Sequence, residues 1–158
     1  MKIAGKKISG PAIEIIPIIR GDEEIILKAQ AVLDYDEFYQ ICPIPKPPEV
    51  VLPGGERRSE IENPDYKKKL TEHSNKKYAW MILKSLAATP SLEWETVDLS
   101  KPETWENYEK ELKDSGFTEQ EIFRIIQTVV NVQGLDNKKI EEARKRFLVS
   151  QVQESKSS

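Results

Sequence analysis

The sequence predicts an α+β protein, with a small N-terminal antiparallel β-sheet made of hairpins followed by a C-terminal bundle of about four helices. Isoleucine-rich runs occupy much of residues 1–33, and one of them alternates apolar with polar residues, as strands with one buried face do. From residue 63 onward, capping residues precede stretches whose apolar residues lie three and four positions apart, which indicates amphipathic helices.

A chain of 158 residues is long enough for one domain with a core and too short for us to expect two. We expect a single domain over residues 1–149. Its expected parts are β-hairpins over 1–33, a short helix over 34–42, a proline-rich strap over 43–62 and the helical part over 63–149, followed by a disordered polar tail over 150–158.

The N-terminal residues predict two hairpins. Gly5 supplies the backbone conformation for a tight turn in the first, and residues 20–23 form the turn of the second. Along residues 25–33 every second residue is apolar, which predicts one buried face. Pro17 has no amide hydrogen to donate, so its strand is expected to be an edge.

A short helix is expected after the hairpins, with Asp34 as its cap and Leu33 stapled onto Phe38, and Pro43 is expected to end it. Half of the ten prolines lie within residues 42–55, which predicts an extended segment without a strand ladder of its own.

The long helix is expected to begin at Asn63 and Pro64 and to run to about Ala88. Its first half carries a cluster of lysines and should be solvated. Residues 78–86 (YAWMILKSL) form the densest apolar run of the chain, so they are expected to be the central buried helix.

Three further helices are predicted from their caps. Ser100 with Glu103 and Thr118 with Glu121 have the spacing of capping boxes, and Asp136 can cap the last helix. The expected inner faces comprise Trp105, Tyr108 and Leu112 in the first, Ile122, Ile125, Ile126 and Val129 in the second, and Ile140, Ala143, Phe147 and Leu148 in the third.

Charge and composition argue against several functions. The balance of 24 basic and 27 acidic residues leaves a net charge of −3, so no overall field favours nucleic acid or an anionic membrane. No apolar run is long enough to cross a bilayer, and we expect a soluble intracellular protein. The lysines of residues 67–77 are better explained as a solvated helix face than as a phosphate-binding surface.

No residues suggest catalysis, a cofactor or a metal. His73 has no cysteine, serine or second histidine at a useful spacing, and Cys42 is expected to be a small apolar filler. We therefore expect no catalytic residue and no enzyme activity.

Protein contacts are the remaining candidate function. Residues 45–48 (PKPP) have the form of a polyproline ligand, although a rigid strap packed on the domain explains them better. The candidate contact residues are Ile16, Pro17 and Ile18 on the strand edge, Ile44, Pro45, Pro47, Pro48, Val50 and Leu52 in the strap, and Phe147 in the last helix.

Several segments together resemble a known family. They are residues 20–22 (RGD) before an apolar strand, the strap 42–55 (CPIPKPPEVVLPGG), 79–86 (AWMILKSL), 92–97 (LEWETV), 104–108 (TWENY) and 140–147 (IEEARKRF). The combination is similar to small proteins encoded among the tail genes of long-tailed bacteriophages, usually described as tail assembly chaperones. The likeness covers most of residues 13–148. The isoleucine-rich hairpin departs from the mainly helical description of many tail chaperones.

The resemblance implies a non-enzymatic factor, without a cofactor, that binds other tail proteins such as the tail tube or tape-measure protein in the host cytoplasm during virion morphogenesis. Two alternatives stay open. The first is a minor structural tail or connector subunit that remains in the virion. The second is a small host-directed inhibitor or enzyme with an unrecognised site.

Overall fold

The computed structural model describes residues 1–156 and is an α+β protein, as predicted. Its strands form three two-stranded antiparallel sheets: β1 (Lys2–Ile3) with β2 (Lys6–Lys7), β3 (Ile13–Arg20) with β4 (Glu23–Gln30), and β5 (Glu49–Val51) with β6 (Arg57–Ser59). Its helices are α1 (Asp36–Ile41), α2 (Pro64–Leu86), α3 (Tyr108–Asp114), α4 (Glu119–Val130) and α5 (Asn137–Lys156), with a 3-10 turn (Pro102–Asn107) before α3 and a π turn (Asn131–Leu135) before α5.

The β3–β4 hairpin has the predicted alternation. Ile16 pairs with Leu27 and Ile18 with Ile25, and the face that contains Ile16, Ile18 and Leu27 is buried. The alternation ends with the strand, because the backbone amide of Val32 bonds to the Gln133 side chain instead of to a ladder. Leu33, which was expected on the buried face, is 79% exposed.

The centre of the core is the second half of α2, as predicted. Asn63 caps the helix by accepting a hydrogen bond from the backbone amide of Tyr66, and Pro64 occupies the first turn. Residues 79–83 are all buried, and Trp80 lies against Phe38 with ring centroids 5.9 Å apart. Phe38 also contacts Trp105 at 5.9 Å, so α1, α2 and the segment before α3 meet at this aromatic cluster.

The short helix α1 begins later than expected. Tyr35 precedes it without a side-chain capping bond, and Asp34, which lies before the helix, accepts from the amide of the first helical residue, Asp36. The predicted staple between Leu33 and Phe38 is wrong, because Leu33 points into solvent while Phe38 is buried.

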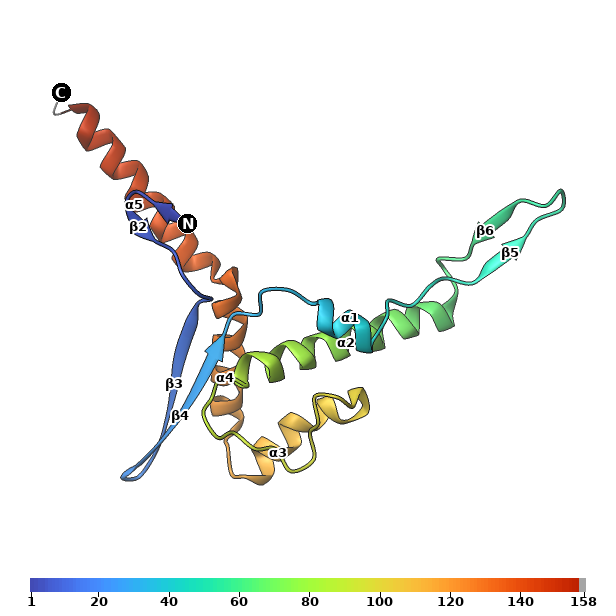
Figure 1. Cartoon of the computed structure of the whole chain (residues 1–158), viewed down its shortest axis with the longest axis horizontal. Helices are drawn as coiled ribbons and strands as arrows, with labels where there is room; N and C mark the ends of the chain where they lie inside the picture. Colours follow the sequence, from blue (N-terminus) through green and yellow to red (C-terminus); the bar gives the residue numbers. More distant parts are fainter. Residues whose placement is uncertain (157–158) are drawn as a thin grey trace.

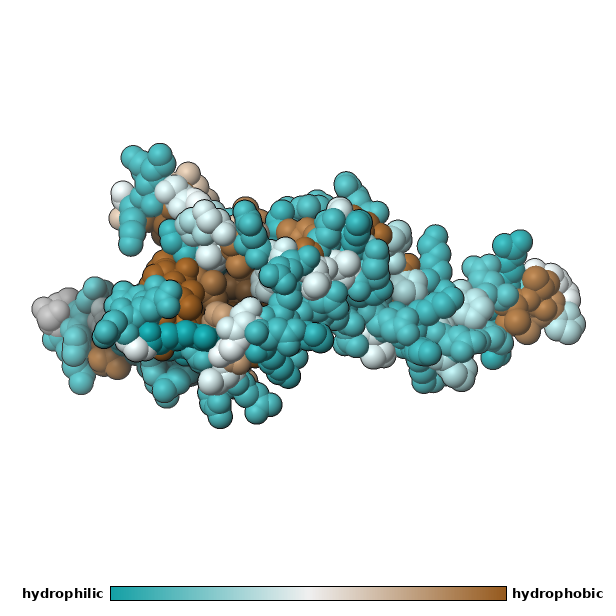
Figure 2. Space-filling model, turned by 90° about the horizontal axis from the view of Figure 1, so that it is seen from below, coloured by the Kyte–Doolittle hydropathy of each residue, from teal (hydrophilic) through white to brown (hydrophobic). Residues whose placement is uncertain are grey.

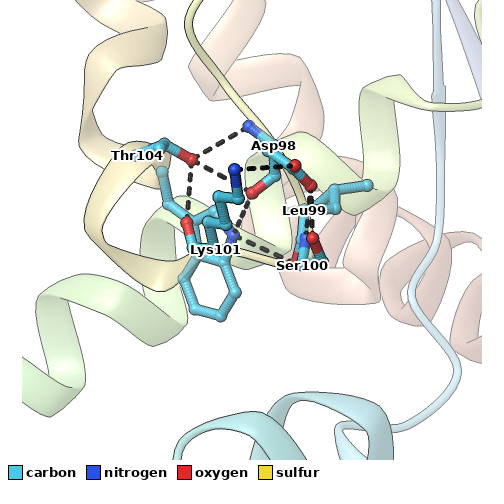
Figure 3. Close-up of polar contacts among 6 residues, drawn as sticks. Asp98, Leu99, Ser100, Lys101 and Thr104 are labelled. Atoms are coloured by element: carbon cyan, nitrogen blue, oxygen red, sulfur yellow. Dashed lines mark hydrogen bonds and ion pairs between the residues drawn. The ribbon is translucent and has the colours of Figure 1, made fainter.

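One of the two predicted capping boxes is confirmed and one is wrong. The Thr118 hydroxyl accepts from the amide of Glu121 (3.1 Å), and the Glu121 carboxylate accepts from the amide of Thr118 (2.9 Å). Ser100 instead donates its amide and hydroxyl to the carboxylate of Asp98, and no side chain caps the following 3-10 turn (Figure 3). Asp98 competes for Ser100 because it lies only two residues away.

The proline-rich segment was expected to lack a ladder, and this expectation is wrong. Its second half forms the β5–β6 hairpin, in which Val50 pairs with Arg58. The turn uses Gly54 (φ 105°) and Gly55 (φ 87°), which adopt this conformation at low cost.

The last helix differs from the prediction in length and in packing. The helix runs to Lys156, so the expectation of a disordered tail is wrong for residues 150–156. Residues 157–158 lie outside the described part of the chain. Asp136 caps it as predicted, by accepting from the amide of Lys139 (3.1 Å). Its expected inner face has no partner on the core, because α5 leaves the core after Gly134 (φ 88°) and none of its residues is buried (Figure 1).

Candidate protein-contact surfaces

Three elements project away from the core (Figure 1). They are the β1–β2 hairpin, the β5–β6 hairpin at the far end of α2, and α5 on the other side of the core. Every residue of these four strands and of α5 is exposed to solvent. We refer to these three elements as the arms.

The arms give the chain a large surface. The accessible area is 11761 Å² for a mass of 18.1 kDa. A compact monomer of this mass exposes about 8,100 Å². The difference of roughly 3,700 Å² exceeds the area of about 800 Å² that one partner contributes to a standard interface. Association could therefore cover much of the arms.

The β3–β4 hairpin exposes apolar residues on the face turned away from the core. Ile16 and Ile18 were predicted as contact residues, but both are buried in the core and unavailable to a partner. The exposed side chains are those of the alternate positions: Ile13, Ile15, Pro17 and Ile19, with Ile26 opposite Pro17. The carbonyl of Pro17 accepts from the guanidinium of Arg124, which ties β3 to α4.

The strap residues lie between the core and the end of the β5–β6 arm. Ile44, Pro48 and Val50 are exposed, whereas Pro45, Pro47 and Leu52 are half-buried. Seen from below, apolar surface gathers at the end of the molecule where β5 and β6 lie (Figure 2). The strap therefore keeps several of its predicted contact residues accessible, and it does not pack as a whole onto the core.

Apolar residues of α5 are equally accessible. Phe147 is 61% exposed, and Ile140, Leu148 and Val152 are exposed as well. At about 100° per residue these side chains share one broad side of the helix, and Val149 points about 200° away from Phe147. Helices with an accessible apolar side can bind a partner by laying that side into a hydrophobic groove.

An apolar cavity of about 290 Å³ opens beside the core, where β4, the end of α2 and α3 meet. Its apolar lining comprises Ile25, Leu27, Leu86, Leu92, Trp94, Leu112 and Phe117. Glu93 and Glu111 contribute acidic groups to its wall, and Arg20 contributes a basic one. The Arg20 guanidinium lies 4.7 Å from the centre of the Phe117 ring and 3.8 Å from the Glu121 carboxylate.

Sequence reasoning missed this cavity. Its lining comes from four separated segments, and no single one carries a site pattern. The alternation of residues 92–96 was the available signal, since two apolar side chains two positions apart on a connector indicate a surface that faces the domain.

The ionisable residues singled out in the sequence have structural partners. The Nε2 atom of His73 donates to the carbonyl of Cys42 (3.0 Å), and the His73 ring stacks on Tyr39. Burial raises the pKa of the Cys42 thiol, and Lys76 offsets this only partly, so the thiol is less reactive than an exposed one. Both residues therefore join α1 to α2.

Glu111 also has a structural role. Burial raises the pKa of this carboxyl, but hydrogen bonds from the Thr96 hydroxyl and from the backbone amides of Glu95 and Thr96 outweigh burial and lower the pKa below its usual value. Glu111 thus fixes the connector that contributes to the cavity wall.

Residues 1–156 contain no group of three or more histidine, cysteine, aspartate or glutamate side chains placed to hold a metal ion. None of the helices in this part of the chain is both long and apolar enough to span a bilayer.

Comparison of the chain with protein-family models, with curated proteins and with solved structures found no match.

Proposed function

We propose that this chain is a non-enzymatic assembly factor for bacteriophage tails, which binds other tail proteins during virion morphogenesis. The carrying observation is that the outer face of β3–β4 exposes Ile13, Ile15 and Ile19, and that the arms bury none of their residues. A factor that covers apolar surface on a partner and later leaves it needs accessible apolar edges and amphipathic helices.

The resemblance in sequence adds the class of partner. It points to the tail tube or tape-measure protein and to action in the host cytoplasm. The outer face of β3–β4 is the strongest contact candidate for such a partner, because it is an apolar surface backed by the core and bordered by two unpaired strand edges.

Co-expression with the tail tube and tape-measure proteins, followed by pull-down, tests the proposal. We expect one of them to be retained by the wild-type chain and lost with Ile15→Glu combined with Ile19→Glu, because two charges would then enter an apolar contact. The matched control is Lys68→Glu on the exposed half of α2. Retention of neither tail protein by the wild-type chain would contradict the proposal.

A second candidate is a minor tail or connector subunit that stays in the virion. The accessible area of 11761 Å² favours it, because permanent subunits often fold with surfaces that only assembly covers. Mass spectrometry of purified particles separates the two functions. A chaperone is expected to be absent from the particle, and a subunit is expected at a fixed copy number.

A further inference from the structure

The charges of the chain are unevenly distributed between two segments. Residues 92–121, which contain α3 and part of the cavity wall, hold ten acidic and three basic residues, for a net charge of −7. The helix α5 holds six basic and three acidic residues, for a net charge of +3. The two segments therefore attract one another when they come from different molecules.

Both segments also carry apolar side chains that remain accessible to solvent. Half-buried Leu92, Trp94 and Phe117 line the cavity, and these residues belong to the acidic segment. The helix α5 exposes Phe147 and Leu148, with Arg144 one turn before them on the same side. An apolar anchor flanked by basic groups on one surface is complementary to an apolar cavity flanked by acidic groups on the other.

We propose that α5 of one copy of this chain docks at the cavity of a second copy, with Phe147 in the cavity and the basic side chains of α5 against the acidic segment. The inference does not depend on the proposed function. Within one molecule the contact is not made, because no residue of α5 is buried and α5 points to the opposite side from α3 (Figure 1).

The charged groups at the cavity permit this contact. Glu93 is exposed, and within residues 1–156 it has no ion-pair partner, so it is free to meet a cation. Arg20 opposes a basic ligand, but its charge is shared with the Phe117 ring and with Glu121. Arg144 bonds to Glu141 at 3.2 Å on the helix surface, and an exposed pair of this kind is easily exchanged for another partner.

Two variants separate the two halves of the contact. Phe147→Glu removes the anchor and leaves the cavity intact, and because Phe147 is exposed the fold is unaffected. Leu92→Arg fills the cavity and adds a positive charge, and leaves α5 intact. Glu93→Lys is the companion variant that alters only an exposed side chain, in case Leu92→Arg perturbs folding. Val149→Glu, on the other side of α5, and Glu56→Lys, in the β5–β6 turn, are the matched controls.

The measurement is sedimentation equilibrium of each purified full-length chain from about 1 to 200 µM, a range that covers micromolar dissociation constants. We expect the wild type and both controls to self-associate, and the dissociation constant to rise about tenfold between low and high salt, because salt screens exposed charges. Phe147→Glu and Leu92→Arg are each expected to weaken association by about 30-fold or more. Glu93→Lys is expected to weaken it less.

The decisive sample is an equimolar mixture of Phe147→Glu and Leu92→Arg. Each variant alone is expected to associate much more weakly than the wild type, yet the mixture should form a one-to-one complex, because the first supplies an intact cavity and the second an intact helix. A mixture that stays monomeric overturns the inference. So does a Leu92→Arg chain that associates like the wild type, which would indicate contact between two α5 helices, and so does a wild type that stays monomeric throughout. None of these outcomes involves a tail protein, so they leave the proposed function untouched.

Discussion

Trp105 shows how one side chain organises the approach to α3. It is fully buried, and its indole Nε1 donates to the carbonyls of Asp98 (3.1 Å) and Leu99 (3.2 Å). The same segment is held by Thr104, whose hydroxyl accepts from the amide of Asp98 (Figure 3). These bonds satisfy backbone groups in a segment that belongs to no regular element, so the connector is fixed from the core side.

Trp105→Phe should lower the free energy of unfolding by about 1–3 kcal/mol, because it removes the indole donor and leaves two carbonyls with fewer partners. Urea denaturation followed by circular dichroism measures the change. Glu103→Gln, on the exposed side of the same turn, is the control and should change stability by less than about 0.5 kcal/mol. Equal stability of Trp105→Phe and the wild type would mean that the two bonds contribute nothing.

Ser85 has the opposite character. Its side chain is fully buried, and among the described residues 1–156 its hydroxyl has no hydrogen-bond partner. Ser85→Ala removes the unsatisfied hydroxyl and improves helix propensity, so we expect the free energy of unfolding to rise by about 1 kcal/mol. Thermal unfolding by differential scanning calorimetry checks this, with exposed Ser74→Ala on the same helix as the control for propensity alone. A loss of stability would show that Ser85 has a partner.

Glu111 predicts a pH dependence. Its folded-state pKa lies below the unfolded value, because bonds from Thr96 and two backbone amides outweigh burial. A depressed carboxyl pKa stabilises the fold above the unfolded pKa of about 4.3 and loses that contribution as pH falls through the folded value. Glu111→Gln should therefore be less stable than the wild type at pH 7, and the gap should close as pH falls from about 5 toward 3. Urea midpoints at both pH values test this, and a constant gap would contradict it.

At the scale of helices and hairpins, the predicted helix caps are present where no neighbouring side chain offers the capping residue another hydrogen bond and where the helix begins as expected. The Thr118 and Glu121 box and the Asn63 cap are both present. The capping box predicted for Ser100 is absent because Ser100 bonds to the carboxylate of Asp98 instead. Asp34 does not cap α1, because the helix begins at Asp36 and Tyr35 occupies the capping position. The fold class followed from periodicity, which is a property of each segment alone.

The contact residues were harder to predict, because period-2 alternation does not state which face meets the core. Ile16 and Ile18 were chosen, and the structure places their odd-numbered neighbours outside instead. The apolar side of a helix likewise does not show whether it packs on the core of the same chain or on a partner. The apolar residues Ile122, Ile125 and Val129 of α4 are buried in the core, whereas the apolar residues of α5, which were also assigned an inner face, are exposed.

The two helices should therefore differ in local stability. Most of the stability of a helix in a protein comes from tertiary packing, and α5 has no buried residue. In dilute protein we expect the amides of α5 to exchange with solvent much faster than those of residues 79–86, which lie in the core. Hydrogen exchange followed by mass spectrometry measures both. Equal protection in a monomeric sample would show that α5 is held by contacts on the core.

Considered as a unit, the chain combines a small core with arms that reach far beyond it. Figure 2 shows the elongated outline and the apolar surface that remains at its end and in a hollowed area on its other half. When a partner covers the arms, their apolar side chains are removed from water. When no partner is present, these side chains stay exposed.

Small-angle X-ray scattering tests this shape directly. A compact chain of 158 residues has a radius of gyration of about 15 Å, and the arms add mass far from the centre. For the monomeric Phe147→Glu chain we expect a value at least about 3 Å larger, with a distance distribution that tails toward long distances. The wild type should match it at low concentration and rise further as α5 docks on a second copy. A monomer near 15 Å would mean that the arms fold back onto the core, and their apolar residues would then be covered within one chain.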